Sequence, residues 1–155
     1  GTPVDDAALR QRVFDWLEDF EADPARHAVL DAGWQVCGEY DNKLSEQDYG
    51  WLVMMHKIDH NEVVWVDVQP DADGNAILPP ALASAVTDLA DRKMVAAALA
   101  ALELGSACKL TNASDTDWLD CQKALRVVGL EVENLLNDWL VARWHTKHGK
   151  KARYD

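Results

Sequence analysis

The signals that most constrain this chain are its helix starts, where a capping side chain stands just before an amphipathic run. Thr2-Pro3-Val4-Asp5 places a capping hydroxyl, a proline at the first helical position and a carboxylate three residues after the cap. Apolar residues then recur at intervals of three and four, which predicts an amphipathic helix of about 18 residues. Its apolar positions are Leu9, Val13, Trp16, Leu17 and Phe20.

Two further starts of this kind follow. A proline after Asp23 opens a predicted helix over 24–41. Two glycines weaken that helix, and a strand beginning at Trp34 is the alternative. A capping box that ends at Asp48 opens a predicted helix over 49–58, for which a buried strand is the alternative.

The strongest strand signal is the run of β-branched residues over 63–68. A turn rich in aspartate, glycine and asparagine follows over 70–75, and 76–78 can return as a second strand. The sequence therefore predicts a β-hairpin in the middle of the chain.

The last two predicted helices cover 80–104, which ends before Gly105, and 116–146. The elements together predict a mainly α fold, a bundle of about five helices with one β-hairpin inserted before the fourth. The alternative is an α+β fold in which segments 34–40 and 49–58 join the hairpin as a small antiparallel sheet flanked by helices. Residues 1–146 are expected to form a single globular domain, followed by a short basic tail over 147–155.

The net charge of −12 is unevenly distributed. Residues 1–142 carry 10 basic and 26 acidic side chains, a net charge of −16, whereas residues 143–155 carry five basic side chains against one acidic one, a net charge of +4. Nucleic-acid affinity comes from neutralising backbone phosphates, so the acidic body is not expected to bind nucleic acid directly. An acidic surface favours a basic protein partner instead.

Cysteine usage and hydropathy bear on the compartment. The three cysteines, Cys37, Cys108 and Cys121, form no CxxC pair, which is typical of reduced thiols in a cytosol. No apolar run approaches the ~18 residues of a membrane span, and the first residues are acidic rather than signal-like. The sequence therefore predicts a cytoplasmic protein without a membrane segment.

A metal site is one alternative reading of the acidic residues. Glu131 and Asp138 share one face of the predicted last helix, and Glu18 and Glu21 near the end of the first helix could complete a site for Mg or Mn. Glu18-Asp19-Phe20-Glu21 resembles the ExxE form of small all-helical nucleotide pyrophosphohydrolases. That resemblance implies a metal-dependent nucleotide or phosphoester hydrolase, but the family's second acidic pair is missing at the expected distance.

His56 and His60 form a second candidate metal pair. Their spacing is similar to the HxxEH pattern of inverted zinc peptidases, with aspartate in place of glutamate. On a helix both rings would share a face and could bind zinc, whereas on a strand they would stand about 13 Å apart.

The function that the sequence favours is a non-enzymatic acidic protein-binding factor, an inhibitor, immunity-type or regulatory protein that docks on a basic partner. Phage-type inhibitors that imitate the nucleic-acid backbone share this charge character. No cofactor is expected for this function, and a helical subunit of a larger assembly or homo-oligomer is a further alternative. Tryptophan is enriched at binding hot spots, and the chain has seven. The expected partner-binding residues are Glu18, Asp19, Glu21, Trp51, Trp65 and Trp144.

Overall fold

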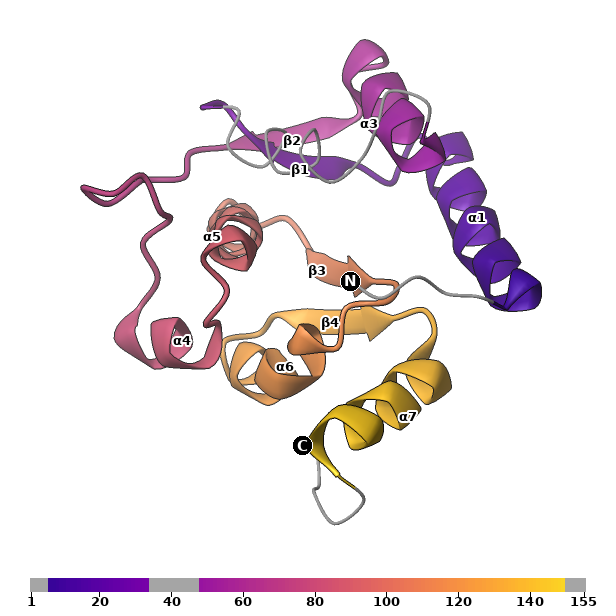
Figure 1. The fold of residues 1–155 in the computed structure, drawn as a ribbon. Helices are drawn as coiled ribbons and strands as arrows, with labels where there is room; N and C mark the ends of the chain where they lie inside the picture. Colours follow the sequence, from indigo (N-terminus) through magenta and orange to yellow (C-terminus); the bar gives the residue numbers. More distant parts are fainter. Residues whose placement is uncertain (1–5, 34–47, 150–155) are drawn as a thin grey trace. The chain divides into compact units, whose positions relative to one another are not determined.

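The computed structural model describes residues 6–33 and 48–149 (Figure 1). The chain divides into two compact units. Residues Phe14–Cys108 form one, which we call the central unit, and Gly1–Val13 with Lys109–Asp155 form the other, the terminal unit. A single domain over 1–146 stays a prediction, and each unit is described by itself below.

The fold is α/β, and the predicted helical bundle with a hairpin is wrong. In the described residues, six helices alternate with four strands, which pair as two separate two-stranded sheets. Both pairs are parallel. Parallel neighbours need a long crossover connection, so each sheet belongs to a β-α-β unit rather than a hairpin. The alternative antiparallel sheet is also wrong, because 49–58 is helical; segment 34–40 lies outside the described residues.

The central unit is built on the parallel pair of β1 (Ala28–Asp31) and β2 (Val63–Val66), with Ala28 opposite Val63. The connection between the strands contains α3 (Tyr49–Asp59), which confirms the helix predicted there. The capping box predicted just before it falls mostly on residues outside the described range. Helix α5 (Leu89–Glu103) packs on both strands through alanines, whose small side chains allow close approach. The buried core of this unit consists of Ala28, Leu30, Val63, Val66, Val68, Ala76, Ala97 and Ala101.

Strand β1 lies where a helix over 24–41 was predicted, and this prediction is wrong for the described part of that range. An apolar tripeptide, Ala28-Val29-Leu30, is compatible with either period. Parallel strands are covered on both faces, so they need a continuous apolar run rather than alternation. The predicted strand at 63–68 is confirmed as β2, but it pairs with β1. The return strand expected over 76–78 does not form, and a single antiparallel bridge between Pro70 and Ala76 stands in its place.

The predicted helix over 80–104 is two helices, α4 (Pro80–Ala85) and α5. Asp88 caps the second helix, because its Oδ1 accepts a hydrogen bond of 2.9 Å from the backbone N–H of Ala90. Arg92 donates hydrogen bonds from its guanidinium to the carbonyls of Ala83 and Val86, which fixes the chain between the helices. The predicted stop is confirmed at Gly105, which has φ +86°.

The terminal unit repeats the β-α-β pattern. Strands β3 (Lys109–Asn112) and β4 (Glu131–Asn134) pair in parallel, and α6 (Asp117–Val127) connects them. Helix α7 (Asn137–His148) follows and packs on α6. Leu119, Leu140 and Trp144 form the buried core between these two helices.

The continuous helix predicted over 116–146 is therefore wrong. Gly129 takes φ +85°, and the N–H groups of Gly129 and Leu130 donate to the carbonyls of Arg126 and Leu125. This is a Schellman motif, which ends α6 and turns the chain into β4. The apolar stripe that suggested one helix continues across the break by coincidence of spacing.

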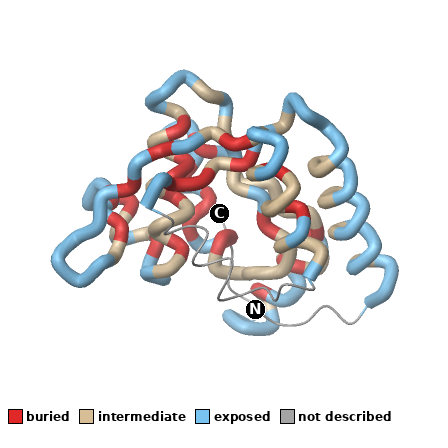
Figure 2. Tube along the Cα trace, turned by 90° about the horizontal axis from the view of Figure 1, so that it is seen from above, coloured by how far each residue is buried: buried red, intermediate tan, exposed pale blue. Residues whose placement is uncertain are grey.

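Burial follows the two β-α-β units (Figure 2). Buried residues gather on β1 and β2 and on the inner faces of α5 and α6, whereas β3 has one buried residue and β4 has none. In contrast, α1 (Ala7–Ala22) has no buried residue over its described length. Long stretches of α1 are therefore available to solvent or to a partner.

Candidate functional site

The net negative charge of this protein resides in one of its two units. The central unit carries 18 Asp and Glu side chains against five Lys and Arg, a net charge of −13. The terminal unit carries nine acidic and 10 basic side chains, a net charge of +1. From the sequence alone, the charge divides between an acidic body and a basic tail. The division into units differs, because the boundary at Lys109 depends on the tertiary structure.

Three of the basic side chains in the central unit are used inside it. The Lys57 side chain is fully buried. The guanidinium of Arg26 lies 5.0 Å from the ring centroid of Trp16 and 5.2 Å from that of Phe20, a cation–π arrangement. Arg92 fixes the α4–α5 break as described. Three of the five positive charges of the unit are thus engaged in contacts within it.

Most acidic side chains of the same unit point outward. Of the 15 that the structure describes, two are buried and two are partly buried. The exposed acidic residues are Asp15, Glu18, Asp19, Asp23, Asp48, Asp59, Asp67, Asp71, Asp73, Asp88 and Glu103. Among the described residues of this unit, eleven acidic side chains and no lysine or arginine are exposed, so its exposed charge is negative throughout. We call these eleven residues the acidic surface.

Helix α1 presents the densest part of the acidic surface. Asp15, Glu18 and Asp19 fall within about 100° of one another around the helix at ~100° per residue, opposite the side of Phe20. Phe20 packs against the buried core of the unit. The acidic face of the helix thus points away from the core as a direct result of its amphipathic pattern.

The residues predicted to bind a partner have different environments. Glu18 and Asp19 are exposed on α1, and Trp65 on β2 is 41% exposed. Trp51 on α3 is partly buried. Trp144 is buried in the terminal unit, where its indole N–H donates to Asp120 Oδ1 over 2.7 Å, so its side chain serves packing there. The last of the six, Glu21, is partly buried.

Glu21 is occupied by an internal contact between α1 and α3. The Tyr49 hydroxyl donates a hydrogen bond of 3.0 Å to Glu21 Oε1, and the Tyr49 ring stacks on Phe14 at a centroid distance of 4.6 Å. Desolvation, followed by the hydrogen bond and charge of Glu21, raises the pKa of Tyr49 from 10.0 to about 12. Glu21 therefore joins α1 to α3, and its role in partner binding stays a prediction.

This contact predicts a pH dependence at the alkaline end. Because the folded state raises the pKa of Tyr49, its contribution to stability is fully present below pH 10 and is lost as the pH rises through about 12. We expect Tyr49→Phe to lose less stability than the wild type between pH 9 and pH 12. Chemical denaturation at each pH measures this, and phenolate absorbance of the folded protein identifies the tyrosine. Tyr40→Phe is the matched control, and equal pH dependence of Tyr49→Phe and wild type would contradict the assignment.

Lys57 is the most unusual side chain of the unit. Its ammonium donates to the backbone carbonyl of Asp23 and to Glu62 Oε1, each over 2.9 Å, and lies 4.6 Å from the centroid of Phe20. The hydrogen bond from Lys57 is the main reason that the pKa of Glu62 lies below its usual 4.5. With a carbonyl, a carboxylate and an aromatic face around it, this ammonium has a structural role in joining α3 to the loop after α1.

Glu131 and Asp138, which the alternative metal site places on one helix, belong to different elements. Glu131 lies on β4, exposed, with its carboxylate 3.8 Å from Arg126, and Asp138 lies on the first turn of α7. Glu18 and Glu21 belong to the central unit. The shared helical face on which Glu131 and Asp138 were grouped therefore does not exist.

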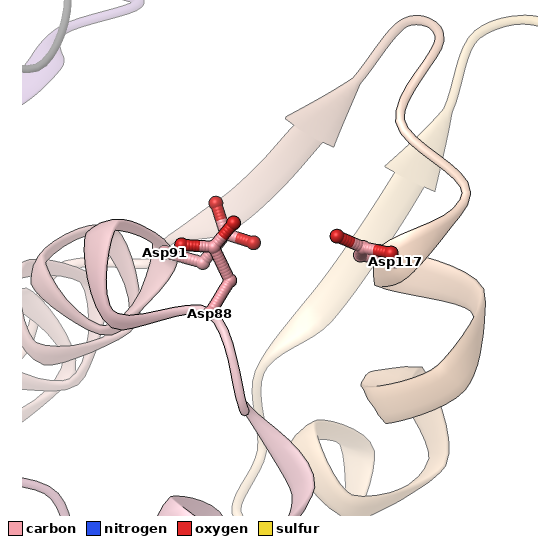
Figure 3. A group of neighbouring side chains, drawn as sticks. All are labelled: Asp88, Asp91 and Asp117. Atoms are coloured by element: carbon pink, nitrogen blue, oxygen red, sulfur yellow. The ribbon is translucent and has the colours of Figure 1, made fainter. Parts of the chain in front are cut away.

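Asp88, the N-cap of α5, and Asp91, on its first turn, form an acidic pair (Figure 3). Their nearest carboxylate oxygens lie within 4.8 Å, and Asp91 is only 4% exposed. Carboxylates are stabilised at a helix N-terminus, which gives this pair a role in starting α5. Figure 3 also labels Asp117, on the first turn of α6 in the terminal unit, where Lys147 lies 3.5 Å from its carboxylate.

An amide network at the carboxyl ends of β3 and β4 was not predicted from the sequence. Asn112 donates from Nδ2 to the Asp115 carbonyl (2.8 Å) and to Asn134 Oδ1 (3.0 Å), and its own Oδ1 accepts from the Asp115 N–H. Asn134 donates onward to Gln122 Oε1 over 3.1 Å. Because Asn112 and Asn134 are opposite each other in register, the network joins strand ends to the loop before α6. The only sequence signal was an asparagine at the end of each strand.

His56 lies on the last turn of α3 and His60 is its C-cap residue, four positions later. Their ring centroids lie 3.9 Å apart with an interplanar angle of 16°. The segment 49–58 is helical, and it was for a helix that the sequence predicted the two rings to share a face.

Two further observations bear on identity. In the parts of the chain that the structure describes, no helix has the length and apolarity that crossing a membrane requires. Comparison with protein-family models, curated proteins and solved structures gives no match for this chain.

Proposed function

We propose that this protein is a non-enzymatic binding factor that docks on a basic protein partner through the acidic surface of its central unit. The observation that carries the proposal is the segregation of charge, −13 in the central unit against +1 in the terminal unit. A random distribution of charged residues for solubility would not require three of the five lysines and arginines of this unit to be engaged in internal contacts. A surface of one sign speeds association with an oppositely charged target and disfavours wrong partners.

Helix α1 is the centre of the proposed interface. Glu18 and Asp19 are exposed on this helix, and none of its residues is buried. Trp65, partly exposed on β2 of the same unit, is a residue type that contributes strongly at interfaces. A partner with a positively charged binding surface fits this chemistry, and a nucleic-acid-binding protein is the most direct example, because it already binds rows of negative charge. The factor would then act as an inhibitor or regulator that competes with the nucleic acid.

The proposal predicts a specific charge-reversal phenotype. We expect Glu18→Lys with Asp19→Lys to weaken binding to the basic partner by about tenfold to 100-fold, roughly 1.4–2.7 kcal/mol, mainly through slower association. Partners are first captured on the immobilised wild-type chain at low salt, and the affinity of each purified partner is then measured at 50 and 300 mM salt. The wild-type affinity is expected to fall by about tenfold or more over that range.

The matched control is Glu131→Lys with Asp138→Lys in the terminal unit, which changes the net charge by the same amount at two exposed positions. It should bind like the wild type. Equal weakening by both double variants would show that net charge, not the acidic surface, governs binding. An affinity that does not change with salt would refute the proposal.

A further inference from the structure

Two imidazole rings stand together at the end of α3, outside the surface assigned above. His56 and His60 are separated by one helical turn, with ring centroids 3.9 Å apart. His60 is exposed and His56 is partly buried, so solvent reaches the pair. Two histidines at this spacing on one helix are the arrangement by which zinc-binding helices supply two ligands.

The hydrogen bond of His60 leaves one defined ring nitrogen available to bind a metal ion. Nδ1 of His60 lies 2.8 Å from the backbone oxygen of His56. A carbonyl oxygen only accepts, so Nδ1 carries the proton, and Nε2 of the neutral ring keeps its lone pair. Metal-binding histidines commonly donate their second N–H to a backbone carbonyl, which fixes the tautomer and the ring orientation. The tautomer of His60 with its proton on Nδ1 is therefore the form that can bind a metal ion, through Nε2.

The surroundings favour a cation. The pair belongs to the unit with net charge −13, and Asp59, between the two histidines in sequence, is exposed. Within residues 6–33 and 48–149, however, no group of three converging His, Cys, Asp or Glu side chains includes either histidine. A metal ion held here would therefore have two protein ligands and would keep water at its other positions.

We propose that His56 and His60 bind a divalent first-row transition ion, Cu²⁺, Ni²⁺ or Zn²⁺, as a two-histidine chelate. Imidazole is a preferred ligand of these ions, whereas Mg²⁺ and Ca²⁺ take oxygen ligands. Each histidine would supply one ring nitrogen to the ion at about 2.0–2.1 Å. The order of affinity should place Cu²⁺ above Ni²⁺ and Zn²⁺.

The test is a titration of the untagged full chain with Cu²⁺ and Zn²⁺ in a non-coordinating buffer at pH 7.5, followed by calorimetry. We expect one ion per chain and tighter binding of Cu²⁺. Replacing either histidine, as His56→Gln or His60→Gln, should weaken binding by about tenfold or more, since even outer-shell partners of metal sites contribute about 10–100-fold. Paramagnetic resonance of the Cu²⁺ form should show coupling to two nitrogens.

Controls separate this chelate from unspecific binding to the acidic surface. His145→Gln with His148→Gln, which removes the two histidines of α7, should leave the affinity unchanged, and circular dichroism confirms that each variant is folded. The proposal is overturned if His56→Gln with His60→Gln binds Cu²⁺ within twofold of the wild type. It is equally overturned if the wild type binds neither ion at millimolar concentration, or if the α7 variant loses as much affinity.

Discussion

Lys57→Ala is expected to lower the free energy of unfolding by about 3 kcal/mol. The substitution removes a fully buried side chain and leaves a cavity beneath Phe20, and truncations of large core residues to alanine typically cost about 2–5 kcal/mol. It also leaves the Asp23 carbonyl and the Glu62 carboxylate without their ammonium donor. In a chain of this length the melting temperature should fall by about 6–12 °C. Urea denaturation followed by circular dichroism gives the difference directly.

Two further variants show what Lys57 contributes. Lys57→Met keeps most of the side-chain volume and should cost less than Lys57→Ala, because Glu62 and the loop at Asp23 still reach water. Lys147→Ala removes an exposed lysine from an ion pair of 3.5 Å and should change stability by less than about 0.5 kcal/mol. If Lys57→Ala were as stable as Lys147→Ala, the buried ammonium would have no structural role.

Asn112→Asp is expected to destabilise the protein by about 3 kcal/mol at pH 7, although it changes the side-chain volume very little. The new oxygen would replace an amide N–H₂ that donates to the Asp115 carbonyl and to Asn134 Oδ1. Oxygens would then face one another without a proton, and a buried group that loses its partner costs about 1–3 kcal/mol, more if charged. Asn112 is only 5% exposed, so water cannot substitute.

The pH dependence provides an internal check on this variant. A protonated carboxyl can donate one hydrogen bond, so the deficit relative to wild type should shrink between pH 7 and pH 4. Asn137→Asp, the same exchange at an exposed position on the first turn of α7, should be neutral or slightly stabilising, because helix N-termini favour negative charge. A deficit for Asn112→Asp no larger than that of Asn137→Asp would contradict the role of the amide network.

Short strands explain most of what the sequence could not predict. Every strand in the described residues is four residues long, which is barely one period of a helix. Over such a length, Ala28-Val29-Leu30 carries no period that separates a buried strand from a helix. The strand at 63–66 was recognised because three of its four residues are valine. Its partner was not, since parallel pairing joins residues some 35 positions apart.

Helix ends were better predicted where a glycine and an apolar pattern agreed. Gly105 was expected to end a helix and does so. Gly129 ends α6 in the same way, but the apolar spacing beyond it continued at helical intervals and concealed the break. Local propensity supports a glycine stop at both positions, and only the tertiary pairing of β3 with β4 distinguishes them.

The candidate surface was predictable in part. The exposure of Glu18 and Asp19 follows from the amphipathic pattern of α1 alone. The burial of Trp144 does not, because it depends on the packing of α7 on α6 and on a hydrogen bond to Asp120, 24 residues earlier. The inward use of Lys57 and Arg92, which makes the surface of the unit acidic, likewise depends on contacts that no spacing in the sequence reveals.

The order of the two units along the chain has a consequence for synthesis on the ribosome. All of Phe14–Cys108 emerges as one continuous stretch, so the central unit has every residue it needs before β3 is translated. The guanidinium of Arg12 donates to the Leu135 carbonyl in the terminal unit, so this hydrogen bond cannot form until 123 more residues have been translated. At about 5–20 residues per second this delay lasts roughly 6–25 s, long compared with the folding of a small domain. Acquisition of structure should therefore be sequential, with the acidic half complete while the nascent chain is still attached.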